Sequence, residues 1–188
     1  DDGNRGTSAN DGGSIWDDPN NTFSWGFKTI NDTSKEKLIP RSTVVTRPNS
    51  AAITTIPIIK PNINELSSLA GVESLSKTEA IEFVKNNLIG KHCEFAVISL
   101  GPEGALLITR EKSYQLIPPA VKKLSTVGAG DSMVAGISYS ISIGKSILES
   151  VKYGVAAGTA ATMNAGTELC HKEDADNLFN QITITELS

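Results

Sequence analysis

The chain has 188 residues, 39% of them hydrophobic, and a formal net charge of −4. That length indicates one domain, or one domain with a tail. A negative net charge argues against a nucleic-acid groove, and no apolar run approaches the ~20 residues that a membrane-spanning helix needs.

The first part of the chain, residues 1–52, differs in composition from the rest. It is rich in Asp, Asn, Gly, Ser and Thr and shows no sustained hydrophobic period. We interpret it as an unassigned segment of loop or disorder, with one short strand around Phe23 to Lys28. The N-terminus has neither the basic nor the apolar region of a signal peptide, and two cysteines make no dense framework. We therefore expect a cytoplasmic protein.

From residue 53 the pattern becomes regular. Residues 54–59 predict a short strand. Asn62 begins a predicted helix that runs through Leu69 and ends at Gly71. A second helix is expected over 77–88, where apolar residues recur on one face, with Gly90 as its C-terminal cap.

A β-rich stretch follows, and then helices. The near-continuous apolar run over 95–100 is typical of a strand buried on both faces. A turn at 101–104 separates it from strands over 105–109 and 114–117. The expected helices cover 129–143, 146–163 and 173–181. This order predicts an α/β fold in which helices cover a sheet.

The most informative motif is Ser125-Thr126-Val127-Gly128-Ala129-Gly130-Asp131-Ser132. Small residues before a long helix let the backbone come close to a ligand, and the free amides of the first turn favour a phosphate. Asp131 could accept the proton of a hydroxyl that attacks that phosphate. Taken alone, the motif fits a tight loop with a helix-favouring aspartate better.

A second motif places Asn62 and Glu65 three residues apart at a helix start. Their oxygens could hold a hydrated Mg²⁺. They could equally form a capping box, in which each side chain bonds the backbone of the other residue. Spacing alone favours neither interpretation.

Four blocks together resemble one protein family. They are Lys60-Pro61-Asn62-x-x-Glu65-Leu66, residues 97–105, residues 125–133, and residues 154–162 with their continuation to Cys170. This series, over about residues 56–182, resembles the ribokinase-like (PfkB-type) carbohydrate kinases, and within them the minor 6-phosphofructokinase branch. The resemblance implies that residues 53–188 are the C-terminal, ATP-binding part of a three-layer α/β/α sandwich, without the N-terminal half and its β lid.

The resemblance also implies an activity. Such a kinase transfers phosphate from ATP to a hydroxyl of a sugar phosphate, here fructose 6-phosphate to give fructose 1,6-bisphosphate in glycolysis. ATP, Mg²⁺ and K⁺ would be its cofactors, and a sugar phosphate its partner. Neither nucleic acid nor membrane is expected, and a homodimer stays open.

Individual roles follow from the matched positions. The resemblance makes Asp131 the catalytic base and gives the anion hole to Gly128, Ala129 and Gly130. Lys60 would lie near the nucleotide phosphates, and Asn62 and Glu65 would organise Mg²⁺. The other matched positions are the nucleotide-lining strand and turn (Ser99, Gly101, Gly104), the helix beside the adenine (Val155, Gly158, Thr159) and the K⁺ ligands (Ser125, Val127, Ala161, Asn164, Gly166).

Some features depart from the family pattern. Asn64 and Glu168 stand where the branch tends to have basic residues. The sugar-binding portion is not found in residues 1–52, so we expect the remaining sheet to expose an edge and an apolar face. The alternative is therefore a truncated, catalytically silent nucleotide-binding remnant or interaction module, and a fragment of a longer product is a third interpretation.

Overall fold

The structure is a computed structural model that describes residues 26–27, 42–45 and 56–187. Its strands are β1 (Gly26–Phe27), β2 (Ser42–Val45), β3 (Ile56–Ile59), β4 (Phe95–Ser99), β5 (Ala105–Ile108), β6 (Ser113–Ile117) and β7 (Thr183–Glu186). Its helices are α1 (Ile63–Ala70), α2 (Lys77–Asn87), the 3-10 helix η1 (Gly101–Glu103), α3 (Ala129–Ser142), α4 (Ile147–Thr162) and α5 (Lys172–Phe179).

The strands form one sheet whose spatial order follows the chain, β1-β2-β3-β4-β5-β6-β7. β3 and β4 are parallel, with Ile58 opposite Phe95, and the helices α1 and α2 connect them. The other neighbouring pairs are antiparallel. The parallel pair brings the ends of β3 and β4 to the same edge of the sheet.

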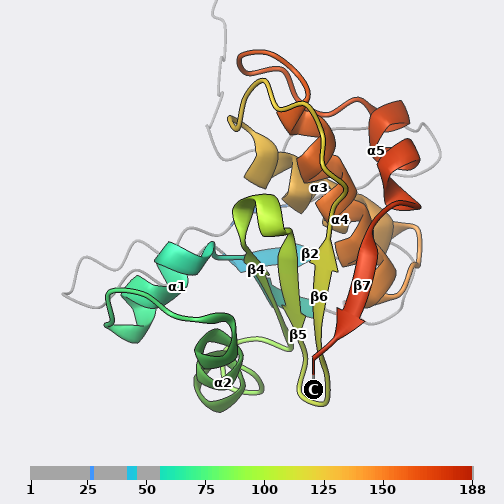
Figure 1. The fold of residues 1–188 in the computed structure, drawn as a ribbon. Coiled ribbons are helices and arrows are strands. Elements are labelled where there is room, and N and C mark those ends of the chain that lie inside the picture. Colours follow the sequence, from blue (N-terminus) through green and yellow to red (C-terminus); the bar gives the residue numbers. More distant parts are fainter. Residues whose placement is uncertain (1–25, 28–41, 46–55, 188) are drawn as a thin grey trace, which may run out of the picture.

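Helices cover both faces of this sheet, which gives three layers (Figure 1). On one face α1 and α2 pack against Ile98, Leu106 and other side chains. On the other face α3, α4 and α5 pack against a set that includes Val97 and Leu107. Neighbouring residues of β4 and β5 thus point into different cores, as the continuous apolar run predicted.

Local signals set the helix ends. Asn62, Ser76 and Ser146 each form a capping box with the glutamate three residues later. Gly71 ends α1 in the left-handed conformation at φ 75°, as predicted. Gly90 does not cap α2, because Leu88 is the cap residue in a right-handed conformation. Gly90 instead bends the following turn at φ 76°, where its amide bonds the Cys93 carbonyl.

Two strands were not expected from the sequence. The interpretation of residues 1–52 as loop or disorder is wrong at β2, which pairs antiparallel with β3 and so occupies the edge expected to be exposed. β7 pairs antiparallel with β6 at the other side of the sheet. At least half of their residues are polar, unlike those of the equally short β3 and β5, so they lack an apolar run, and tertiary pairing stabilises them. β1 lies within the short strand predicted around Phe23 to Lys28.

The helices of the described part are all too short or too polar to cross a lipid bilayer.

Candidate functional site

The carboxyl ends of β3 and β4 lie side by side and carry two of the predicted motifs. Lys60 directly follows β3, and Asn62 forms an isolated parallel bridge with Ser99, the last residue of β4. The Ser99 amide donates to the Pro61 carbonyl at 3.0 Å, and the Ser99 hydroxyl donates to the same oxygen at 3.5 Å. The sheet therefore fixes the start of α1 beside the turn that follows β4.

The start of α3 has the geometry of an anion site. Gly128 precedes the helix at φ 76° and ψ −4°, a left-handed conformation that favours glycine. The amides of Gly130 and Asp131 have no backbone acceptor in the described part of the chain, and no side chain caps the helix. Asp131 is exposed in this first turn. Free amides and the helix dipole favour a phosphate here.

Lys60 connects the two helix starts. A side-chain carbon added at Gly130 would lie 3.7 Å from Lys60 Nζ, so the ammonium lies directly beside the first turn of α3. Burial lowers the pKa of Lys60, while the charges of Glu65 and Asp131 oppose that change by raising it. Both carboxylates are therefore near this half-buried cation. The predicted Mg²⁺ motif and the predicted catalytic base are brought together through Lys60.

Asn62 and Glu65 form the capping box that was one of their two interpretations. The Glu65 amide donates to Asn62 Oδ1 at 2.8 Å, and the Asn62 amide donates to Glu65 Oε2 at 2.8 Å. The second carboxylate oxygen of the exposed Glu65 takes no part in this box. Among the described residues no group of three or more His, Cys, Asp or Glu could hold a metal ion. The oxygen of Glu65 outside the box suits only an Mg²⁺ that takes most of its ligands from water or phosphate, and binding of Mg²⁺ here stays a prediction.

The turn after β4 is built on two glycines with different surroundings. Gly101 is at φ 61°, and an added side-chain carbon would meet nothing within 4 Å. Gly104 is at φ 85°, and the same carbon would lie 1.9 Å from the Leu116 carbonyl oxygen. The Leu100 amide also bonds the Gly104 carbonyl at 2.8 Å. Gly104 is thus required for packing against β6, whereas Gly101 is open to solvent.

The loops before α3 and after α4 meet beside the anion site. Ser125 Oγ donates to the Gly166 carbonyl at 2.7 Å and accepts from the Val127 amide at 3.1 Å. The Asn164 side-chain amide donates to the Leu169 carbonyl at 2.7 Å. Ala161 is buried in the last turn of α4. The structure thus joins Ser125, Val127 and Gly166. Binding of a monovalent cation by these loops stays a prediction.

The matched positions on α4 are mostly covered by protein. Val155 is 1% exposed in the core beneath α3, and Gly158 is buried against that helix. Thr159 is half-buried, and its hydroxyl donates to the Val155 carbonyl at 2.7 Å. Contact of these residues with an adenine ring stays a prediction.

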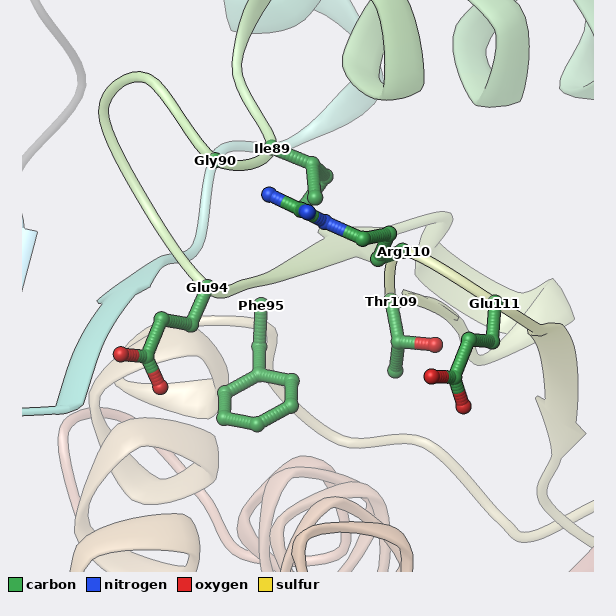
Figure 2. A pocket seen from close by; sticks show the side chains of 7 residues that line it. All are labelled: Ile89, Gly90, Glu94, Phe95, Thr109, Arg110 and Glu111. Atoms are coloured by element: carbon green, nitrogen blue, oxygen red, sulfur yellow. The ribbon is translucent and has the colours of Figure 1, made fainter.

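A cavity of about 420 Å³ lies at the other end of β4 (Figure 2). Its lining includes Phe95, the first residue of that strand, the exposed Arg110, and the carboxylates of Glu94 and Glu111. None of the predicted site residues lines it. Sequence reasoning did not find this cavity, because its lining comes from the start of β4 and from the segments before it and after β5, which carry no motif.

Comparisons with known proteins agree with the motif pattern. A model of the pfkB family of carbohydrate kinases matches residues 34–174, a range that includes β2. The chain is 38% identical over 154 residues to the ATP-dependent 6-phosphofructokinase isozyme 2 of Escherichia coli K12, a match covering 82% of this chain and 47% of that protein. It is 35% identical over 131 residues to a 1-phosphofructokinase of Borreliella burgdorferi, covering 69% of this chain and 42% of the relative.

Solved structures agree as well. Escherichia coli phosphofructokinase-2 in complex with potassium superposes with a TM-score of 0.60 at 40% identity, covering 66% of this chain and 40% of that chain. Arabidopsis thaliana ribokinase complexed with ribose and ATP gives a TM-score of 0.58 at 26% identity, covering 65% of this chain and 40% of that chain. The chain thus spans about half the length of the curated relatives it matches.

Proposed function

The chain belongs to the pfkB family of carbohydrate kinases, with a ribokinase-like fold, and we propose that it carries the ATP-binding and proton-accepting part of a sugar-phosphate kinase. The observation that carries the proposal is the place of Lys60, beside the first turn of α3 and near both Glu65 and Asp131. A cation, free amides and a carboxylate at one point suit the transfer of a phosphoryl group to an alcohol.

Each group has a role in the proposed reaction. The amides of Gly130 and Asp131, with the Lys60 ammonium, hold the terminal phosphate of ATP. The Asp131 carboxylate accepts the proton of the sugar hydroxyl while that oxygen forms its bond to phosphorus and the bond to ADP breaks. Mg²⁺, when bound near Asn62 and Glu65, neutralises phosphate charge. K⁺ would be held by backbone carbonyls of the two loops that meet at Ser125, Val127 and Gly166.

We propose fructose 6-phosphate as the acceptor, which would give fructose 1,6-bisphosphate. Support comes from the 6-phosphofructokinase and 1-phosphofructokinase among the similar proteins, which both act on phosphorylated fructose by name. A panel of fructose 6-phosphate, fructose 1-phosphate and tagatose 6-phosphate would compare acceptors directly. A higher kcat/KM for either of the other two would reassign the acceptor and leave the chemistry in place.

The test of the chemistry is ADP release that depends on both sugar phosphate and Mg²⁺. Asp131→Asn is expected to lower kcat by at least ~100-fold, because removal of a general base typically costs that much. Asp174→Asn is the matched control, since Asp174 also lies in the first turn of a helix, α5. Unchanged turnover in the Asp131 variant would contradict the proposed role.

A second candidate function is a nucleotide-binding module without turnover. It rests on the extent of the matches, which cover 47% and 42% of the two relatives and leave the rest of those proteins without a matched counterpart. Calorimetry separates the two candidates, because the module would bind Mg·ATP and release no ADP with any sugar phosphate of the panel.

A further inference from the structure

The helices α3 and α4 touch through glycines, and one of these glycines faces the anion site. A side-chain carbon added at Gly158 would lie 3.0 Å from the Ala129 carbonyl oxygen and 3.3 Å from Met133 Cβ. Ala129 is the first residue of α3 and immediately precedes Gly130 and Asp131. Gly158 therefore contacts the turn whose free amides form the candidate anion site.

Two further glycines line the same contact farther from the site. A carbon added at Gly154 would lie 2.8 Å from the Met133 carbonyl, one turn along α3. A carbon added at Gly136 would lie 2.9 Å from Ala157 Cβ. Gly136 is eight residues beyond Gly128, or about 12 Å at 1.5 Å per residue. The contact is crowded throughout, but of these three positions only Gly158 meets the first turn.

We propose that Gly158 is a positioning residue, whose missing side chain sets where the first turn of α3 lies and thereby aims the amides of Gly130 and Asp131 at the terminal phosphate. This inference rests on the proposed function. It differs from the role that the family resemblance gave to Gly158, which was contact with the adenine ring.

The physical reason lies in the atom that Gly158 faces. A backbone carbonyl cannot rotate away as a flexible side chain can, so at 3.0 Å the neighbouring turn must yield by a few tenths of an ångström. Such a shift moves the amides relative to a phosphate, and misplacement of about 1 Å can cost a hundredfold in rate. In Gly158→Ala, the higher helix propensity of alanine compared with glycine offsets part of the loss of stability that the crowding causes. Function should therefore fall more than stability.

The test compares Gly158→Ala with Gly136→Ala in the full 188-residue chain. Calorimetry measures the dissociation constants of AMP and of a magnesium-bound, non-hydrolysable ATP analogue, and thermal melting measures stability. We expect Gly158→Ala to weaken the triphosphate at least tenfold and AMP less than twofold. Gly136→Ala is expected to lower the melting temperature at least as much and to leave both dissociation constants unchanged.

Three results would overturn the inference. One is an equal loss of AMP and triphosphate affinity, which would indicate adenine contact. Another is a loss of nucleotide affinity in both variants that is proportional to the decrease in their melting temperatures. A third is a Gly158→Ala chain that does not fold while Gly136→Ala does, which would assign Gly158 to core packing.

A wild-type chain that binds neither nucleotide would contradict the proposed function. The inference is then judged on the ligand-free chain by hydrogen exchange at the amides of residues 129–131. Altered exchange in Gly158→Ala, and not in Gly136→Ala, supports it, and equal exchange in both rejects it.

Discussion

Two carboxylates, Glu65 and Asp131, lie near the half-buried ammonium of Lys60 at the candidate site. Burial lowers the pKa of Lys60 more than Glu65 and Asp131 raise it, so the folded chain disfavours the charged form. The proposed phosphate binding would use that same charge. We therefore expect Lys60 to cost stability in the free protein and to contribute affinity in a nucleotide complex.

Lys60→Met should separate these two effects. At pH 7 the variant is expected to be at least as stable as the wild type, because methionine removes the buried charge. At pH values between the lowered pKa of Lys60 and its ordinary value of 10.5, the folded wild type binds fewer protons than the unfolded chain. The stability of the wild type therefore rises with pH in this range, and the stability advantage of the variant shrinks. Urea unfolding at pH 7 and pH 10 measures both. Triphosphate affinity should fall at least about tenfold, in line with the loss of one charge-assisted bond.

The exposed Lys112 is the control for this experiment. Its ion pair with Glu186 raises its pKa, so its removal should bring no gain in stability at pH 7 and no loss of nucleotide affinity. A Lys60→Met chain that is less stable than wild type at pH 7, with Lys112→Met unaffected, would contradict the account of the buried charge.

The two glycines of the turn after β4 give a stability prediction of their own. Gly104→Ala should destabilise the chain by at least about 2 kcal/mol, because a backbone conformation reserved for glycine and an overlap with the Leu116 carbonyl act together. Gly101→Ala should cost only the ~1–2 kcal/mol of a left-handed residue, since nothing lies near its added carbon. An equal loss of unfolding free energy in the two variants, measured with urea, would show that the turn relaxes around the added carbon and would contradict this prediction.

At the scale of elements, an ion pair ties the turn η1 to helix α2. Lys77, the first residue of α2, pairs with Glu103 of η1. The Gln115 side-chain amide donates to the Glu103 carbonyl at 3.3 Å. A lysine is unfavourable at a helix start, because the helix dipole repels a positive charge there. Its pairing with Glu103 joins the start of α2 to the turn after β4, and we expect it to help position that turn, for which nucleotide contact is predicted.

Charge reversal tests this contact. Lys77→Glu should raise the dissociation constant of Mg·ATP by at most about fivefold, since an exposed ion pair contributes ~0.2–1 kcal/mol. The double variant Lys77→Glu/Glu103→Lys should restore the wild-type value, because the pair forms again in the opposite sense. A double variant that binds no better than the single one would contradict the positioning role.

Most elements from residue 53 onward could be predicted, because their signals are local. The capping residues Asn62 and Ser146 and the stop at Gly71 fixed helix ends correctly. β2 and β7 could not be predicted, since they lack the apolar run of β3 and β5 and are stabilised by pairing with β3 and β6. The contact of Gly158 with Ala129 was equally hidden, because it depends on how two helices pack.

At the scale of the whole molecule, the candidate site draws on all three layers, because it combines the ends of β3 and β4 with the starts of α1 and α3. α1 belongs to one face of the sheet and α3 to the other (Figure 1). Lys60 lies two residues before Asn62, the cap of α1, and its ammonium lies beside Gly130 in the first turn of α3. Two helix starts therefore direct their positive dipole ends to one place, at the carboxyl ends of β3 and β4. In the proposed function, the fold would thus favour an anion there before any ligand binds.

Backbone amide chemical shifts test the anion site most directly. A titration of the ¹⁵N-labelled chain with Mg·ATP, compared with AMP, observes Gly130 and Asp131 themselves. The account predicts large shifts of these two amides with the triphosphate and small ones with AMP, because only the triphosphate reaches the start of α3. Shifts that are confined to other parts of the chain, with these two amides unmoved at saturation, would contradict it.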